Sequence, residues 1–335
     1  MRRGQITAAL SAFATVAMLA FGASTATAAG PRMTAGGPVT QLTAKGPLAT
    51  AFAFGSGQTF VSGVGATSKA RGGVYLLRRG RLRLLTGSPK FVYGIAWHHG
   101  SLYVAGTRTL YRWSNFDGSR FTRRRTIYRA PTGFEQFNGL AFGANGRLYA
   151  GVGIYEDSDD HGPTSSPYAR DILTFSTSGV GPEVFATGIR QPWQLAFPRG
   201  SNSPFVSDLG PDNIPGQPNP PDMILRVTAG QNYGFPTCDW SAPSACGGYA
   251  TPLKLLPPHT DPMGVATDKN RLYFTQYGVR AGAKVSWMLQ SGGAVHQAVT
   301  GFDTYIVALG QHDGSVYCGE VTGQIYRFTP QRRRS

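Results

Sequence analysis

The stretch GLAFGANGRLYAGVG, residues 139–153, consists of two short apolar runs on either side of a glycine-rich turn. Runs of this kind, bounded by glycines and containing aromatic and β-branched residues, are typical of paired β-strands. A third apolar run, RDILTF at residues 170–175, follows after a gap. The local pattern is therefore strand, turn, strand, gap and third strand.

The same pattern occurs six times along the chain. The first strands of the units begin near Ala51, Gly94, Gly139, Gln194, Gly264 and Ile306. Their spacing, roughly 40 to 70 residues, is that of a propeller blade with its loops. One small sheet cannot bury both faces, whereas a ring of blades buries all of them and leaves only short edges. The sequence therefore predicts an all-β fold, a six-bladed β-propeller, rather than a pair of β-sandwiches.

The two ends of the repeat indicate how the ring closes. The last unit ends at IYRFTP with no fourth strand after it, whereas the first unit has RLRLLTG to serve as its own outer strand. The segment PVTQLTA, from Pro38 to Ala44, is free to supply the missing strand. We therefore expect one propeller domain over residues 29–335, closed by its own N-terminal strand.

The first 28 residues have the pattern of a signal peptide. Arg2 and Arg3 form a basic start, the run from Ile6 to Phe21 is apolar, and Ala26-Thr27-Ala28 has the form of a cleavage site. No later apolar run is long enough to span a bilayer. We expect removal of residues 1–28 and a secreted, extracellular protein.

The cysteines are consistent with an oxidising compartment. Cys238 and Cys246 bracket the short loop CDWSAPSAC, where a local disulfide is expected, the alternative being two free thiols. Cys318 lies in the strand-like run SVYCGE and is expected to be buried.

Only 15% of the residues are charged, yet the formal net charge is +15. Basic residues gather at Arg78–Arg83, at Arg123–Arg125 and in the tail QRRRS. A secreted chain rarely meets nucleic acid, so we expect no nucleic-acid partner. The clusters are interpreted as a solvated basic surface or as an attraction to an anionic cell-wall polymer or acidic glycan.

Three long insertions fall in consecutive units: Tyr155–Tyr168, Asp208–Asp222 and Cys238–His259. Because binding residues of propellers are carried by loops at one end of the channel, we expect all three to surround the site. The second insertion is rich in oxygen donors, which a hard cation such as Ca2+ requires. Candidates are the carboxylates of Asp208, Asp212 and Asp222 and the carbonyls of Gly210, Pro211 and Tyr233, although Asp also caps turns.

Other candidate residues are basic. Arg190, in GIRQPW, precedes an inner strand, where a guanidinium can clamp a carboxylate by two hydrogen bonds or can bond loop carbonyls. A general base near neutral pH is most often a histidine. His259, in PPHTDPMG, and His161, in EDSDDHG, are the candidates from this sequence.

Several of these segments together resemble the soluble quinoprotein glucose/sorbosone dehydrogenases. The similarity covers most of the mature chain and is strongest in TGIRQPWQLAF, SDLGPD, DMILRVTAGQNYGFP, GLAFGANGRLYAGVG and LYFTQYGVRAGAKV. It implies a secreted six-bladed propeller that holds Ca2+ and pyrroloquinoline quinone (PQQ). It also implies a small-molecule sugar substrate, oxidised at its anomeric carbon.

The resemblance also assigns roles to individual residues. Arg190 matches an arginine that contacts the quinone, Gln191 takes the place of an asparagine, and Arg280 lies near a segment that supplies a basic cofactor contact. Positions that line the family's calcium site are matched by Gly210, Pro211, Asp222 and Tyr233.

Three positions depart from the family pattern. Glu135 or Gln136 stands where the family has its catalytic histidine, Met223 replaces a glutamate, and Asp303 or Thr304 replaces a cofactor-binding arginine. Glu135 could act as the base if burial raised its pKa, and His259 or His161 could act from another blade. Two alternatives are a non-catalytic propeller that binds carbohydrate or wall polymer, and a metal-dependent lactonase.

Overall fold

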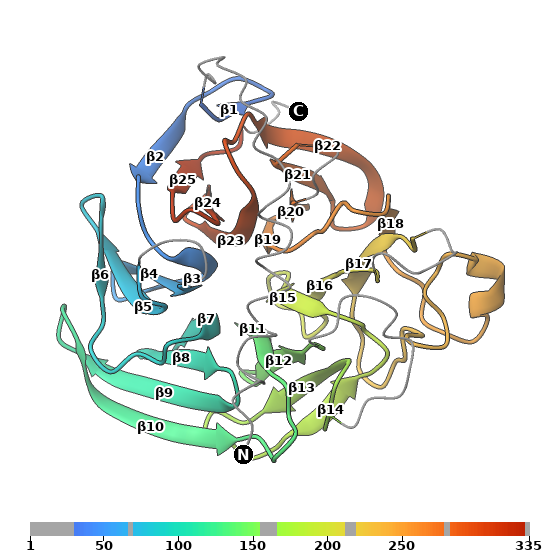
Figure 1. Ribbon diagram of the computed structural model, residues 1–335, viewed down its shortest axis with the longest axis horizontal. Coiled ribbons are helices and arrows are strands. Elements are labelled where there is room, and N and C mark those ends of the chain that lie inside the picture. The colour runs from blue at the N-terminus through green and yellow to red at the C-terminus, as the bar shows by residue number, and fades with distance from the viewer. Residues whose placement is uncertain (1–29, 66–69, 155–165, 212–218, 278–281, 332–335) are drawn as a thin grey trace, which may run out of the picture.

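Six small antiparallel sheets lie around a common axis in the computed structural model, which describes residues 30–65, 70–154, 166–211, 219–277 and 282–331 (Figure 1). Each sheet is one blade, so the predicted six-bladed β-propeller is confirmed. The inner strands begin within three residues of the predicted positions, at Leu48, Val92, Phe137, Pro192, Val265 and Ile306.

Within a blade the strands follow one another from the channel outward, in chain order. Blade 1 contains β3 (Leu48–Gly55), β4 (Gln58–Val64), β5 (Gly73–Arg78) and β6 (Arg81–Leu84). Blade 2 contains β7 (Val92–His98), β8 (Ser101–Gly106), β9 (Thr109–Phe116) and β10 (Phe121–Arg129). Blade 3 contains β11 (Phe137–Phe142), β12 (Leu148–Val152), β13 (Asp171–Phe175) and β14 (Glu183–Ala186).

The second half of the ring repeats this arrangement. Blade 4 contains β15 (Pro192–Ala196), β16 (Phe205–Asp208), β17 (Asp222–Arg226) and β18 (Lys254–Leu256). Blade 5 contains β19 (Val265–Asp268), β20 (Arg271–Gln276), β21 (Lys284–Leu289) and β22 (Gly292–Thr300). Blade 6 contains β23 (Ile306–His312), β24 (Ser315–Glu320) and β25 (Ile325–Phe328).

The N-terminal strand β2 (Val39–Thr43) completes blade 6, as predicted from the missing fourth strand. It pairs antiparallel with β25, with Val39 opposite Phe328 and Thr43 opposite Ile325. In Figure 1 the blue β2 therefore lies beside the red blade 6. The preceding strand β1 (Arg32–Met33) adds a fifth strand to blade 5 by pairing with β22, which the sequence did not indicate.

Glycines at the start of several inner strands let the blades approach one another around the axis. A Cβ on Gly94 would lie 2.6 Å from the backbone of Gly139, and a Cβ on Gly264 would lie 2.7 Å from the backbone nitrogen of Leu309. Real Cβ atoms do not come this close to backbone, so a side chain at either position would force two blades apart. This explains the glycine that opens GIAW, GLAF and GVAT.

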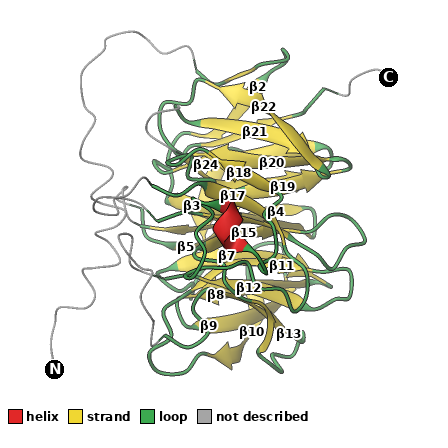
Figure 2. Cartoon of the chain, turned by 90° about the vertical axis from the view of Figure 1, so that its right-hand side faces the viewer, coloured by secondary structure: helices red, strands yellow, loops and turns green. Residues whose placement is uncertain are grey.

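We call the end of the propeller at which the inner strands begin the site face. Both the loops that lead into inner strands and the loops that join second to third strands open there. Figure 2 shows the ring from its edge, with the short 3-10 helix η1 (Pro243–Cys246) facing the viewer. None of the helices in the described part of the chain has the length and apolarity needed to cross a membrane.

Candidate functional site

A buried apolar cluster lies at the site-face ends of the inner strands. Tyr93 and Trp193 pack edge to face with their ring centroids 6.4 Å apart. Leu48, Met263 and Val307 belong to the same buried cluster, and the five side chains come from five different blades. A ligand at the site face would therefore rest on an apolar floor and contact polar groups only at its edges.

Arg190 lies at this level, in the loop that leads into β15, and is 3% exposed. Its Nη1 donates to the carbonyl oxygens of Leu209 (3.1 Å) and Gly210 (3.0 Å). The guanidinium thus holds the start of the β16–β17 loop, which is the structural role left open for it. The quinone contact implied by the resemblance stays a prediction, and it would have to share this guanidinium with the two carbonyls.

Gln191 links blade 4 to blade 3. Its backbone N–H donates to Oδ1 of the buried Asp208 (2.7 Å), and its side-chain Oε1 accepts from the backbone N–H of Ile154 (2.9 Å). The space above Gly153 is taken up by this side chain, because a Cβ at Gly153 would lie 2.1 Å from Gln191 Oε1 and 2.4 Å from Asn138 Nδ2. Gln191 and Asn138 therefore crowd the same position at the junction of the two blades.

Asn138 was not among the sequence candidates, whereas Gln136 was named there only as an occupant of the family's base position. Gln136 Nε2 donates to Asn138 Oδ1 (2.8 Å), and both side chains are buried. The Asn138 Nδ2 group has no hydrogen-bond partner within the described residues. A buried amide N–H without an acceptor costs about 1–3 kcal/mol, so an acceptor oxygen at this position would be stabilised. The signal in the sequence was a pair of amides at the start of the strand that follows Glu135.

Asp222 begins β17 and is 2% exposed. Its Oδ1 accepts from the backbone N–H of Gly210 (2.8 Å), and its Oδ2 accepts from those of Thr260 (2.8 Å) and Asp261 (2.9 Å). The carboxylate therefore fastens two loops of the site face to each other. Coordination of Ca2+ by Asp222, Gly210 or Pro211 stays a prediction, and no three His, Cys, Asp or Glu side chains of the described ranges form a group that could hold a metal.

Tyr233 lies in a long connection between β17 and β18, and its oxygens are engaged inside that connection. Its hydroxyl donates to the Arg226 carbonyl (2.7 Å), and its own carbonyl accepts from Trp240 Nε1 (3.0 Å). The ring is buried in the core between blades 3 and 4. The resemblance implies a metal role for Tyr233, and that role stays a prediction. The hydrogen bonds described above already engage the two oxygens of this residue.

The expected disulfide between Cys238 and Cys246 is present, with the two Cα atoms 5.4 Å apart. Its loop does not surround the channel, as we had expected, but extends from the outer edge of blade 4, at the right of Figure 1. The physical reason is that this loop joins a third to a fourth strand, and so starts from the end opposite the site face. The chain returns to the site only after β18, in the loop around Thr260 that leads into β19.

The candidate bases lie on site-face loops of blades 3 and 5. The half-buried Glu135 precedes β11, and its backbone N–H donates to Ser166 Oγ (3.2 Å). His259 has its Nε2 2.6 Å from Asn219 Nδ2, so this ring nitrogen is placed to accept from the amide. His161, Asp212 and Arg280 lie outside the described residues. Catalytic roles for Glu135 and His259 stay predictions.

Two further carboxyl groups, both missed in the sequence, titrate near neutral pH. Burial, together with the nearby Asp303 carboxylate, raises the pKa of Glu320 to about 7, against the opposing effect of N–H groups of Thr304 and Asp303 and of the Thr322 hydroxyl. Burial raises the pKa of Asp171 to about 7. Glu320 ends β24 and Asp171 begins β13, so both lie at strand ends on the site face.

We expect Glu320→Gln to flatten the pH dependence of stability. A carboxyl whose pKa is higher in the native state than its ordinary value of 4.5 binds its proton more tightly when folded. Its contribution is complete below pH 4.5 and is lost as the pH rises through about 7. The loss from Glu320 should reach about 3 kcal/mol at most, and Asp171 contributes a second loss.

Urea unfolding between pH 4.5 and 8 checks this expectation. Glu320→Gln should remove roughly half of the wild-type decline in unfolding free energy, since Asp171 retains its own share. Glu183→Gln is the matched control, because Glu183 is exposed and paired with Arg147. Equal pH slopes for wild type and Glu320→Gln would contradict the raised pKa.

A cavity of about 280 Å³ lies elsewhere, at the outer side of blades 5 and 6. Arg271, Trp287 and His296 line it, with the Arg271 guanidinium 4.6 Å from the centroid of Trp287. None of the sequence-predicted site residues lines this cavity.

Fold and site together define the class: a six-bladed β-propeller with a polar set of residues on an apolar floor at one end of its channel. No family model matches the chain, and no curated protein matches it either. Solved structures do. An aldose sugar dehydrogenase from Streptomyces coelicolor, in its PQQ-bound form, is 19% identical, with a TM-score of 0.67 over 88% of this chain and 98% of that one.

Two other solved structures are similar over comparable lengths. A calcium structure of a Trichoderma reesei carbohydrate-active enzyme of family AA12 is 14% identical, with a TM-score of 0.73 over 91% of this chain and 98% of that one. A gluconolactonase from Xanthomonas campestris is 15% identical, with a TM-score of 0.59 over 90% and 95%. The TM-scores and coverages show that the chain shares the propeller fold of these proteins, and at these identities the similarity shows the fold alone.

Proposed function

We propose that this chain is a secreted sugar dehydrogenase that depends on PQQ and Ca2+ and oxidises an aldose at its anomeric carbon. The observation that carries the proposal is that three features suited to binding a quinone and a cation lie together at the site face. They are the family-like motif around Arg190, the carbonyl-rich turn at Gly210 and the buried Asn138 Nδ2 group, which has no partner among the described residues. The fold shared with a PQQ-bound aldose dehydrogenase supports it.

The donor set fits an anionic, planar cofactor. A quinone carrying carboxylates needs a cation, amide donors and an apolar surface. Arg190 offers the guanidinium, Asn138 offers an N–H group to which the described part of the chain gives no acceptor, and the cluster around Trp193 offers the surface. Ca2+ takes 6–8 oxygen ligands, and the carbonyls of Leu209, Gly210 and Pro211 with nearby carboxylates are the oxygens that this loop can offer.

Oxidation of an aldose to its lactone removes a hydride from C1 and a proton from the C1 hydroxyl. Bound PQQ, polarised by Ca2+, would accept the hydride. The proton must pass to a base of the chain, and Glu135 is the carboxylate that stands at the family's base position. Arg190 and Asn138 would fix the orientation of the bound ring, while the apolar floor excludes water from the reacting atoms.

The test uses the chain that begins at Gly30, with PQQ and CaCl2 added. Absorbance titration should show saturable quinone binding, and dye reduction should follow on addition of aldoses. Arg190→Lys keeps one donor for the loop carbonyls but loses the planar fork, so quinone affinity should fall about tenfold or more. Arg147→Gln is the control, because this arginine lies in the β11–β12 turn, at the end of blade 3 opposite the site face, and is paired with Glu183.

Glu135→Gln separates binding from chemistry. It should bind PQQ as tightly as wild type and lose dye reduction by a factor on the order of 10² to 10⁴, the usual contribution of a general base. Absence of quinone binding by the wild-type chain with Ca2+ present would overturn the proposed function. Full activity of Glu135→Gln would move the base to another residue, with His259→Gln as the next variant.

A lactonase is the second candidate, because a gluconolactonase shares the fold. Its chemistry needs a metal that activates water, which usually calls for several side-chain ligands. The described ranges contain no group of three such side chains. Hydrolysis of a sugar lactone by the same purified chain, dependent on a divalent metal and independent of PQQ, would favour this candidate.

A further inference from the structure

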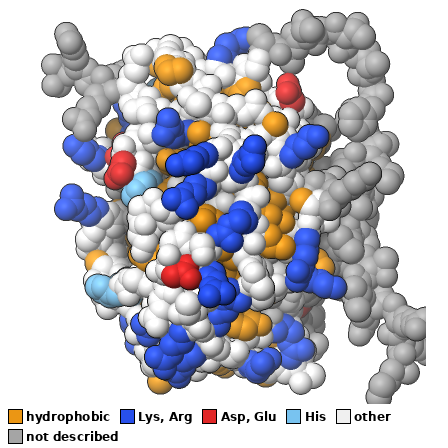
Figure 3. All heavy atoms as spheres, turned by 90° about the vertical axis from the view of Figure 1, so that its left-hand side faces the viewer, with side chains coloured by type: hydrophobic (Ala, Val, Ile, Leu, Met, Phe, Trp, Pro, Cys, Tyr) orange, Lys and Arg blue, Asp and Glu red, His pale blue; other side chains and the backbone are white. Residues whose placement is uncertain are grey.

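The net charge of the protein is concentrated in blades 1 and 2. Between Leu48 and Arg129 the chain has fourteen Lys and Arg residues and one acidic residue, Asp117. The rest of the chain has eighteen Lys and Arg against sixteen Asp and Glu, so it is almost neutral. Figure 3 shows the corresponding side of the molecule, on which Lys and Arg side chains gather and few acidic ones are seen.

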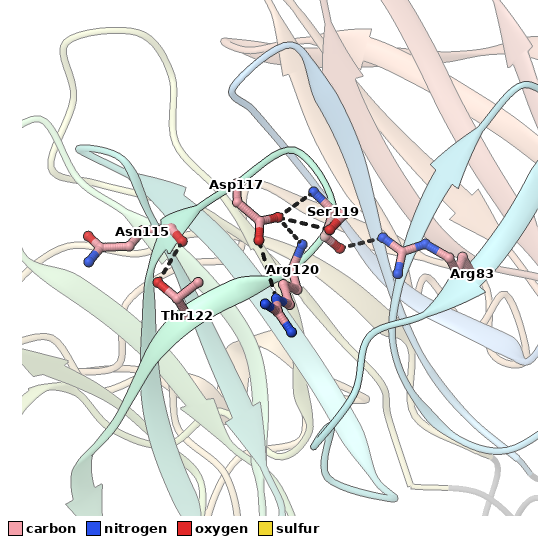
Figure 4. A network of polar contacts seen from close by, with 6 residues as sticks. All are labelled: Arg83, Asn115, Asp117, Ser119, Arg120 and Thr122. Carbon is pink, nitrogen blue, oxygen red and sulfur yellow. Dashed lines mark hydrogen bonds and ion pairs between the residues drawn. The ribbon is translucent and has the colours of Figure 1, made fainter.

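Asp117, the one acidic residue of this region, accepts hydrogen bonds within the β9–β10 turn. Asp117 Oδ1 accepts from the backbone N–H groups of Ser119 and Arg120, both at 2.8 Å, and from the Ser119 hydroxyl at 2.9 Å (Figure 4). Its Oδ2 pairs with Arg120 Nε at 3.3 Å. These bonds, chiefly those from the N–H groups of Arg120 and Ser119, lower the pKa of Asp117 to about 2. Asp117 therefore neutralises Arg120 alone.

Two arginines join the outer sides of the two blades into one surface. Arg83 of β6 donates to the Ser119 carbonyl in the β9–β10 turn (Figure 4). The Arg124 guanidinium of β10 stacks on Trp113, 4.6 Å from the ring centroid, and its Nη1 lies 2.3 Å from where a Cβ on Gly87 would stand. Gly87 follows β6, so the arginine reaches blade 1.

We call six further exposed arginines, on β5, β6, the turn between them and β10, the basic wall. None of them makes an ion pair within the described residues, and all are exposed. They are Arg78, Arg79, Arg81, Arg123, Arg125 and Arg129.

Some of these like charges lie close enough in the folded protein to repel one another. Arg123 and Arg125 are two residues apart on one strand, so their side chains leave the same face about 7 Å apart. Arg125 is also directly opposite Arg112 of β9, and like charges in that position destabilise a sheet. An anionic partner would relieve this repulsion, and a partner with repeated charges would relieve it at several positions together.

We propose that the basic wall is a binding site for a linear acidic polysaccharide. The wall arginines lie on outer strands and on the β5–β6 turn, and the two aromatic side chains packed beneath Arg124 and β10 are buried: Trp113 is 1% exposed and Phe121 is 4% exposed. Single-stranded nucleic acid is usually held by exposed aromatic rings, and duplex readout requires an element that enters a groove. The wall offers repeated charge and hydrogen-bond donors alone, which suits carboxylates or sulfates along a glycan chain.

Binding of polygalacturonate by the chain that begins at Gly30 tests the proposal. Affinity should fall steeply as NaCl increases, because counterions are released on binding, and neutral dextran should not bind. Arg123→Gln/Arg125→Gln should lower affinity about tenfold at 0.1 M NaCl and reduce the salt slope by about two. The matched control is Arg226→Gln/Arg327→Gln, two exposed arginines of blades 4 and 6 that change the net charge equally.

Three outcomes would overturn the proposal. Equal losses in the two double variants would show that net charge, and not the wall, attracts the polymer. Tighter binding of single-stranded DNA than of polygalacturonate at the same salt concentration would point to nucleic acid instead. Binding that does not weaken with salt would exclude the arginines as its source. All measurements are made without PQQ, so their failure leaves the proposed dehydrogenase function untouched.

Discussion

A chain that begins at Lys45 should be unable to form a stable monomeric propeller. It lacks β2, which supplies the fourth strand of blade 6 through pairs from Val39–Phe328 to Thr43–Ile325. Val39 packs on the core between blades 5 and 6, and Leu42 packs on the core between blades 6 and 1. Both side chains are only partly buried, so their burial contributes roughly 1–3 kcal/mol, and the loss of β2 leaves β25 as an unpaired edge.

A chain that begins at Pro38 is the matched control, and a chain that begins at Gly30 is the reference. Starting at Pro38 removes β1 and the burial of Met33 but keeps the ring closed. We expect a moderately lower urea midpoint for this chain, and aggregation or loss of the cooperative transition for the chain from Lys45. A chain from Lys45 that remained monomeric, with the reference midpoint, would show that closure by β2 is not needed for stability.

The closing strand could be predicted because it follows from a count along the chain. The last unit lacks a fourth strand and the N-terminal segment has one to spare, so a single arrangement completes the last blade. The short β1 could not be predicted in this way, because its two residues, Arg32 and Met33, have no strand pattern of their own. Pairing with β22 gives it a place only after the ring has formed.

The candidate site was predicted less completely, for a physical reason that Asp222 and Glu320 illustrate. The sequence placed Asp222 in an oxygen-rich loop, but its three N–H donors come from residues 12 to 39 positions away and are known only from the fold. Glu320 did carry a usable signal. It follows Val316 and Cys318 at a period of two, and so lies on the buried face of β24. Its raised pKa depends on blade packing, which no local pattern contains.

The outer loop between β17 and β18 shows the opposite error, a signal that was over-interpreted. The length of Cys238–His259 suggested that this segment lies at the rim of the site. In the structure this long loop contains the Cys238–Cys246 disulfide and extends from the side of the ring. Loop length alone does not tell at which end of a blade the loop begins, whereas strand order does.

Asp222→Ala should cause the largest loss of any single substitution at the site face. Removal of the carboxylate leaves the N–H groups of Gly210, Thr260 and Asp261 in the interior without their acceptor. An unsatisfied buried donor costs about 1–3 kcal/mol, so a loss of about 3 kcal/mol or more in unfolding free energy is expected. Asp222→Asn should fall between wild type and Asp222→Ala, because the amide keeps one acceptor oxygen.

The exposed turn of blade 2 provides the control. Asp117 also accepts two backbone N–H groups at 2.8 Å, but it lies at the surface, where water replaces the carboxylate. Asp117→Ala should therefore shift the urea midpoint much less than Asp222→Ala, although similar bonds are removed. Equal shifts would mean that burial does not decide the cost and that the two site-face loops are held by something other than Asp222. A larger shift for Asp222→Ala, together with weaker PQQ binding, would tie the cofactor site to loops that this one carboxylate fastens.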